Sequence, residues 1–323
     1  TYVVLGIQGS ALDVASFSNN TEIELGTTSI TLDEYETYTI PSSDVTLGSL
    51  LKSTSPVSSG TKSSGDGAPL TPLIFKGKLF EIPISRYDPI YFDFYALEDT
   101  QIKIYNSTGS GWNLVETFNL NKGSAVSKSY PGTDTDIGVE ISYLINSTGD
   151  ILVFFRGHVD DYMPLVPVGK EFYVEPSNYL QIGAVYDNTQ VTVYYSDGTS
   201  TSFILNAGQA WTSSALGADG TADSARIVAN NSIFAYQQAD SDGTEVSPGL
   251  PPKLMDYIFV FPQNAEYFVA VTLTNRTTNC TLYDSSGAID NSWEVTANYP
   301  YPGKISHGTG QDGTTYILSL IHI

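Results

Sequence analysis

Apolar and polar residues alternate over short stretches of this chain, and one such stretch recurs three times. The alternating apolar pairs are Ile102 with Ile104, Val191 with Val193, and Cys280 with Leu282. A period of two residues is typical of a β-strand that buries one face. Each stretch runs into a Gly, which supplies the turn backbone that a residue with a Cβ atom resists. Each copy is therefore predicted to be a strand followed by a tight turn.

The spacing of these stretches indicates an internal repeat. Successive copies begin at Thr100, Thr189 and Thr278, which are 89 residues apart both times. Thr, Tyr, Ser and Gly fall at the same place in each copy. Such agreement at a fixed period is the sequence signature of a repeat protein.

Further matching stretches extend each copy. Stretches containing Pro precede the copies at 77–83, 169–176 and 256–262, and apolar stretches at 151–155 and 233–237 follow the first two. Each copy then holds about six or seven short strands, the number in an immunoglobulin-like sandwich. We predict an all-β fold of tandem immunoglobulin-like β-sandwich repeats. A propeller is the alternative, but its blades have roughly 40–50 residues, about half of this period.

The repeats divide the chain into four parts. Residues 1–70 are expected to hold an N-terminal extension strand and a linker. Residues 71–166 and 167–254 are each expected to form a sandwich, and residues 255–323 an incomplete one. The linker is placed at 53–69, because Ser, Gly and Pro in such numbers are typical of a flexible or exposed segment.

The third copy is shorter than the others. It lacks a counterpart of the stretches at 151–155 and 233–237, and a sandwich without one strand leaves backbone N–H and C=O groups unpaired. One explanation is truncation. Residues Leu318–Ile323 match one reading frame of a common transposase sequencing adapter, which indicates a gene fragment whose true C-terminus is lost.

The second explanation is that a strand from another subunit fills the gap. The N-terminal stretch belongs to none of the three copies, and its apolar residues point to both faces: Tyr2, Val3, Val4, Leu5 and Ile7. It is expected to be either a donor strand that enters the third sandwich of a neighbour or an ordinary strand of its own sheet. A head-to-tail contact that does not close on itself makes a filament.

Charge and cysteine content narrow the range of partners. The 323 residues include 35 acidic and 14 basic side chains, a net charge of -21. Such a surface repels phosphates and anionic lipids, so nucleic-acid binding is not expected. No stretch approaches the roughly 20 apolar residues that a membrane-spanning helix needs. The single cysteine, Cys280, allows no internal disulfide and is expected in the core.

Catalytic motifs are not found in the sequence, and we expect no enzyme. There is no P-loop, no Rossmann glycine pattern and no Ser in a nucleophile elbow. Asp240, Asp242 and Glu245 alternate around a Gly and are candidate calcium ligands, since calcium prefers carboxylate oxygens. The full calcium-binding loop is incomplete, and Asp-Gly is also ordinary turn sequence. No other cofactor is expected.

Asn-x-Ser/Thr sequons mark candidate sites for N-linked glycans. They begin at Asn19, Asn106, Asn146, Asn230, Asn275 and Asn279. In an archaeon or a eukaryote these are candidate glycosylation sites, whereas in most bacteria they are not. Glycans are therefore among the expected partners or modifications of this chain.

The second copy resembles a known family of surface proteins. It reads PVGKEFYV at 167–174, QIGAVYDNTQVTV at 181–193, LNAGQAW at 205–211 and GLPP at 249–252. These strand and turn patterns resemble the N-terminal region of the IgGFc-binding protein family, over roughly residues 75 to 270. The resemblance implies a secreted or surface-displayed β-repeat region with a binding or structural role and no catalytic residue. The layout of the N-terminal strand is also similar to that of donor-strand pilins.

Together these features predict a structural subunit of an extracellular microbial filament, a pilus-like fibre that forms by N-terminal donor-strand insertion. Its partners would be further copies of itself. The alternatives are a cell-surface adhesin that binds glycan or protein, and a surface-layer protein. The chain begins at Thr1 without Met, so a secreted protein would have lost its leader.

Overall fold

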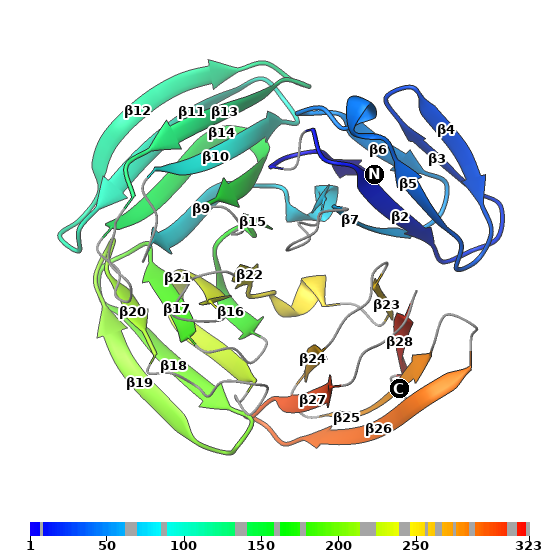
Figure 1. The fold of residues 1–323 in the computed structure, drawn as a ribbon. Helices are drawn as coiled ribbons and strands as arrows, with labels where there is room; N and C mark the ends of the chain where they lie inside the picture. The colour runs from blue at the N-terminus through cyan, green and yellow to red at the C-terminus, as the bar shows by residue number, and fades with distance from the viewer. Residues whose placement is uncertain are drawn as a thin grey trace. The chain divides into compact units, whose positions relative to one another are not determined.

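The computed structural model describes residues 1–6, 9–61, 70–84, 89–132, 141–157, 162–174, 179–213, 224–238, 246–255, 258–261, 267–273, 276–283, 288–308 and 315–320. The chain forms two compact units, one of Leu73–Leu254 and one of Thr1–Pro72 together with Met255–Ile323. Antiparallel sheets dominate both (Figure 1), which confirms the all-β, repeat-built fold. No helix in the described ranges is long and apolar enough to cross a membrane.

The unit of Leu73–Leu254 contains two sheets of seven strands each. The first sheet comprises β9 (Gly77–Ile84), β10 (Ile90–Ala96), β11 (Thr100–Ser107), β12 (Asn113–Leu120), β13 (Ala125–Tyr130), β14 (Ile141–Arg156) and β15 (Tyr162–Pro164). The second comprises β16 (Gly169–Val174), β17 (Tyr179–Ala184), β18 (Thr189–Tyr195), β19 (Ser200–Leu205), β20 (Ala210–Thr212), β21 (Ala225–Gln238) and β22 (Val246–Pro248). The 3-10 helices η2 (Leu73–Phe75) and η3 (Pro252–Leu254) flank them.

Each sheet is organised around one long strand that two groups of strands share. The first half of β14 pairs with β9 and β11, and its second half pairs with β10 and β15. β12 then extends the first group by pairing with β11, and β13 extends the second by pairing with β10. β21 divides in the same way between β16 and β18 and between β17 and β22. Each copy is thus a sandwich-like repeat whose two groups are joined by a continuous strand.

The pairing order within a copy differs from that of an immunoglobulin domain. In an immunoglobulin sandwich the first strand of the domain pairs with the second. Here the first strand, β9, pairs with β14, and β10 lies in the other group. Alternation predicts which residues face the core, but it carries no information on which strands become neighbours.

The described part of residues 1–72 forms another copy of the same strand order, although the sequence was expected to set residues 1–70 apart from the repeats. The strands are β1 (Tyr2–Val3), β2 (Leu12–Ser16), β3 (Thr21–Leu25), β4 (Thr28–Leu32), β5 (Thr37–Ile40), β6 (Leu50–Ser53), β7 (Val57–Thr61) and β8 (Thr71–Pro72), with η1 (Ser42–Asp44) after β5. One group is ordered β4-β3-β6-β1, with β8 added beside β1, and the other is ordered β5-β2-β7. The long strand is split here into β6 and β7.

The C-terminal copy includes a strand that corresponds to the first half of β14, and the described residues hold no counterpart of the stretch at 151–155 that the sequence was expected to lack. Its strands are β23 (Ile258–Phe261), β24 (Tyr267–Thr272), β25 (Arg276–Tyr283), β26 (Ile289–Ala297), β27 (Gly303–Gly308) and β28 (Thr315–Leu320). β28 pairs with β25 and β23, as the first half of β14 pairs with β11 and β9. β24 pairs with β27, and no other strand in the described part of the chain pairs with β24.

Alternating residues fill the cores as the sequence predicts. Ile102, Ile104, Val191 and Val193 are fully buried, and Cys280 is 4% exposed, which confirms its expected core position. Complete burial of such a side chain stabilises the fold by about 1.5–3 kcal/mol relative to exposure. Aromatic rings pack around Phe92. The distances between its ring centroid and those of the neighbouring rings are 5.7–6.2 Å, for Phe94, Tyr130, Tyr143 and Phe155.

Candidate binding surfaces

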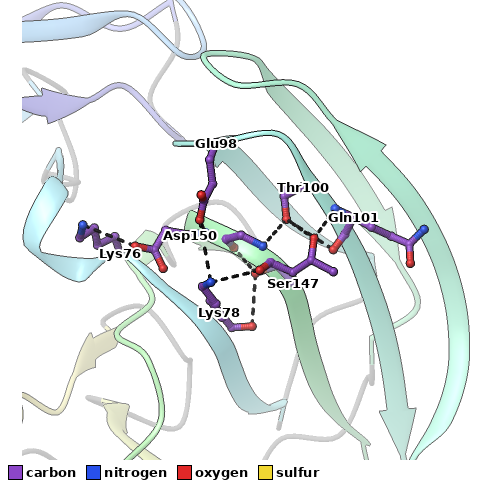
Figure 2. Close-up of polar contacts among 9 residues, drawn as sticks. Lys76, Lys78, Glu98, Thr100, Gln101, Ser147 and Asp150 are labelled. Atoms are coloured by element: carbon purple, nitrogen blue, oxygen red, sulfur yellow. Dashed lines mark hydrogen bonds and ion pairs between the residues drawn. The ribbon is translucent and has the colours of Figure 1, made fainter.

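A polar cluster holds the bend in β14 where the strand passes from one group to the other (Figure 2). The Thr148 hydroxyl accepts a hydrogen bond from the Gln101 backbone N–H at 3.0 Å and lies 3.2 Å from the Thr100 hydroxyl. The Thr100 hydroxyl accepts one from the Gly149 N–H at 2.8 Å, and Ser147 donates to the Gly149 carbonyl at 2.7 Å. These groups satisfy one another, so the cluster is a structural element of the bend.

Charged side chains surround this cluster without forming a site. Lys78 donates to the Thr148 carbonyl at 3.1 Å and lies 3.9 Å from Glu98, whose carboxylate accepts the Asp150 N–H at 2.7 Å. Lys76 lies 3.4 Å from Asp150. The two Lys side chains are 54% exposed. Such pairs contribute about 0–1 kcal/mol each.

The two copies of the Leu73–Leu254 unit are joined by the turn after β11. The Gly111 N–H donates to the Ala207 carbonyl at 3.2 Å, and the Trp112 indole N–H donates to the Val185 carbonyl at 2.9 Å. The Ser107 side chain packs directly on the backbone of Gly208, where a Cβ atom would not fit. Trp112 is therefore part of the junction between copies.

A small polar cavity lies at the same junction. Its volume is about 270 Å³, and it is lined by Ser107, Thr108, Gly109, Ile141, Ser142, Gly208, Gln209 and Ala210. None of these lining residues is charged. The Ser142 hydroxyl is fully buried and has no hydrogen-bond partner in the described structure. Since a buried hydroxyl normally has a partner, this oxygen is available to a ligand or to water.

Glu81 is a second buried group without a partner, also at this junction. It is 0% exposed, and neither carboxyl oxygen has a hydrogen-bond partner among the described residues. Its carboxyl packs against Gly183 on β17, in space that any side chain at 183 would occupy. Close by, the Tyr236 hydroxyl donates to the Pro83 carbonyl at 2.8 Å. Burial raises the pKa of Glu81 well above its ordinary value, because a charged carboxylate is poorly solvated there.

Other buried charges in this unit are paired. Asp93 is 0% exposed and accepts a hydrogen bond from Arg156 at 3.0 Å, and the same guanidinium donates to Ser127 at 2.8 Å. In the second copy Arg226 donates to Glu171 at 2.8 Å. Among the buried charges that the structure describes in this unit, Glu81 is therefore the one without an ionic partner.

Each copy ends in an outermost strand with one open edge. Four of these outermost strands are β4, β12, β19 and β26, and the opposite ends of the same sheets are β8, β13, β20 and β23. Three of the first four expose large apolar residues, with Leu114 57%, Ile204 62% and Ile289 64% exposed. An edge strand presents unpaired backbone N–H and C=O groups to which another strand can add.

The residues expected to form a donor strand pack in their own copy. Tyr2 and Val3 pair on one side with β6 and on the other with β8. Val3, Val4 and Leu5 are fully buried, and the Tyr2 hydroxyl donates to the Val57 carbonyl at 2.6 Å. The stretch is therefore the first strand of a copy and not a surplus strand, which corrects the expectation that it belongs to no repeat. Ile7 lies outside the described residues.

The described sequons lie on different elements of the fold. Asn19, Asn146 and Asn230 are exposed, whereas Asn106 on β11 and Asn279 on β25 are half-buried. The Asn230 side-chain oxygen accepts the Gln190 N–H at 2.8 Å, the role that Thr148 has in the preceding copy. Asn275 lies outside the described residues.

The calcium candidates Asp240, Asp242 and Glu245 also lie outside the described residues. Within the described ranges, no three His, Cys, Asp or Glu side chains gather as a metal site would require. A scan of the chain against protein-family models finds no match, and a search of curated proteins finds no relative. The resemblance to the IgGFc-binding protein family stays a prediction, so function is argued from the sheets themselves.

Proposed function

We propose that this chain is a structural subunit of an extracellular microbial filament or coat, whose copies join by adding strands to one another's sheets. The observation that carries the proposal is the recurrence of one strand order in three copies and, in part, in a fourth, each time with an open outermost strand. A repeat of this kind offers several equivalent edges for addition. The net charge of -21 keeps free subunits soluble and apart until such edges meet.

One route of assembly is the insertion of residues 1–8 into a neighbour. The acceptor would be the side of β24 that corresponds to the position of the second half of β14 beside β10. Insertion requires Val3, Val4 and Leu5 to leave their own core, where they are fully buried. Exposure costs about 1.5–3 kcal/mol for each of the three side chains. Burial of the same side chains in the acceptor sandwich has to offset this cost.

Deletion of residues 1–8 tests this route. If the N-terminal strand is the donor, the deleted protein stays monomeric by sedimentation velocity and shows no filaments by negative-stain electron microscopy, whereas the full chain shows filaments. Circular dichroism checks that the deleted protein keeps its sheets. Filaments from a folded deletion variant would refute the N-terminal route and leave addition at the open edges.

A second candidate function is that of a surface adhesin that binds a small neutral glycan. The observation that favours it is the uncharged cavity of about 270 Å³ with the unpartnered hydroxyl of Ser142. Hydroxyl and amide groups of this kind bind sugar hydroxyls and impose no charge on the ligand. A glycan array tests this function, and substitution of Ser142 by Val should abolish any hit that uses the cavity.

A further inference from the structure

The face of β9 and β14 that packs on the second copy of the Leu73–Leu254 unit is polar. Ser142 on β14 lies opposite Pro83 on β9, and Glu81 lies two residues along β9 from Pro83. Paired residues and residues two apart share one face of a sheet, so these three point the same way. On that face Glu81 packs on Gly183 of β17, and the Pro83 carbonyl accepts a hydrogen bond from the Tyr236 hydroxyl at 2.8 Å. These five residues form the seam between the two copies.

The closed seam gives the Glu81 carboxyl no solvation. The residue is 0% exposed, and neither carboxyl oxygen has a hydrogen-bond partner among the described residues. The carboxyl fills the space over Gly183, where no Cβ atom would fit. A buried carboxylate without a donor is far more costly than a buried neutral acid. The closed seam therefore favours the protonated form of Glu81.

No cation in the described structure faces Glu81 to change this preference. The strands that pack against β9 are β14, β17 and β21. Their titratable side chains on the seam face are Tyr179 and Tyr236, and the first half of β14 contributes none. Lys78 on β9 belongs to the opposite face, since it is an odd number of residues from Glu81. By register, the nearest cation on the seam face is Lys103, two strands away on β11.

Scattered hydrogen bonds join the two copies, and no strand of one copy pairs with a strand of the other in the described ranges. The Gly111 N–H donates to the Ala207 carbonyl at 3.2 Å, and the Trp112 indole N–H donates to the Val185 carbonyl at 2.9 Å. The cavity of about 270 Å³ lies beside the seam, with walls from both copies that include Ser142. Two residues of strand, about 7 Å, separate this position from that of Glu81. Separation of the copies at the cavity would therefore admit water to the carboxyl.

We propose that the seam is a pH-controlled contact, which stays closed while Glu81 carries its proton and opens to water when Glu81 loses it. Burial raises the pKa of Glu81 well above 4.5 in the closed seam, and hydration in the open seam returns the pKa towards 4.5. The closed form is thus fully favoured below the ordinary pKa. Each pH unit above the raised pKa then favours the open form about tenfold.

Hydrogen exchange of the full chain between pH 5 and pH 9, measured by mass spectrometry, tests the proposal. Glu81→Gln is neutral at every pH, and the intrinsic pH dependence of amide exchange cancels in the ratio of the two proteins. The ratio for the peptide that contains Gly111 should be flat at low pH and then rise by up to about tenfold per pH unit. The ratio for β10, whose strand pairs lie within one copy, should stay near one. An equal rise in both peptides would mean global unfolding and would overturn the proposal.

A thiol placed in the seam gives a second measurement. Ser142→Cys puts the thiol at a fully buried position, and its alkylation by iodoacetamide is read on its own peptide, apart from Cys280. The alkylation rate relative to the same variant with Glu81→Gln should rise with pH as the exchange ratio does. Glu98→Gln, which neutralises a 54% exposed carboxylate of the same copy, should keep the wild-type profile.

The fold of each variant is checked by circular dichroism, and Glu81→Met is a second neutral variant of similar length if Glu81→Gln fails to fold. Exchange and alkylation ratios that stay near one up to pH 9 would overturn the proposal. The seam lies within a single chain, so the measurement is made on monomers. Its failure would leave the proposed filament untouched, and the absence of filaments would leave the seam untouched.

Discussion

The two copies within Leu73–Leu254 share one strand order and differ in how they handle buried charge. In the first copy Asp93 lies 3.0 Å from Arg156, and in the second Glu171 lies 2.8 Å from Arg226. Only the first copy also buries Glu81, which has no partner among the described residues. The position of Glu81 corresponds to Tyr173 in the second copy, since both follow the Phe that pairs near the start of the long strand. The difference shows that the alternation of apolar and polar residues determines which residues face the core. Whether a buried charge has an ion-pair partner depends on the individual residues around it.

The largest effect is expected where a paired charge loses its partner. Arg156→Met removes the guanidinium from Asp93, which is 0% exposed, and should lower the free energy of unfolding by about 3–5 kcal/mol. Urea unfolding followed by circular dichroism measures the loss. The double variant with Asp93→Asn should recover much of it, because no buried carboxylate then remains. A loss below about 1 kcal/mol would mean that the pair is solvated.

A smaller effect is expected where Glu81 meets β17. Gly183→Ala places a methyl group in the space of the Glu81 carboxyl and should cost about 1–3 kcal/mol. Gly60→Ala is the matched control, since Gly60 also lies in a strand but has open space around its Cα atom. It should change the free energy of unfolding by less than about 0.5 kcal/mol. If Glu81→Ala does not reduce the cost of Gly183→Ala, the two residues do not compete for space.

Glu81 should also make stability depend on pH. Because its pKa is raised in the folded protein, the folded state holds a proton that the unfolded state has released above the ordinary pKa of 4.5. Stability from this group is thus full below that pH and falls as pH rises through the raised pKa. Glu81→Gln should remove this slope. Thermal unfolding across pH compares the two proteins, and parallel curves would show that Glu81 does not titrate in this way.

The smallest effect is expected at the bend in the long strand, where the two copies use different residues as the acceptor of one equivalent hydrogen bond. Thr148→Val leaves the Gln101 N–H without its acceptor and should cost about 1 kcal/mol. Thr148→Asn supplies the amide oxygen that Asn230 provides in the second copy, and should cost less than about 0.5 kcal/mol. Equal losses in urea unfolding would show that the bond is not transferable between copies.

The sequence predicted the strands well where the alternation was regular. Burial at Ile102, Val191 and Cys280 follows from the period of two. The N-terminal copy was missed because it is shorter, so that Thr21 precedes Thr100 by 79 residues and not 89. A signal was present: Thr21 is buried like Thr189, and each donates to the carbonyl three residues before it.

The candidate binding surfaces were harder to predict from the sequence than the strands. The burial of Glu81 depends on Gly183, which is far away along the chain, and on a pairing order that alternation does not specify. The open edges become visible only when the sheet order shows which strands are outermost. Composition gave the net charge, but not which strands lie at the open edges of the sheets.

The strand shared between two groups has a mechanical consequence. β14 and β21 each run through both groups of their copy, so pulling either strand out of register disturbs both groups at once. When force is applied to the two ends of a copy, we therefore expect the whole copy to unfold in a single step. Under tension such a protein would unfold one copy at a time, because the segments between copies form fewer backbone hydrogen bonds than the sheets within each copy.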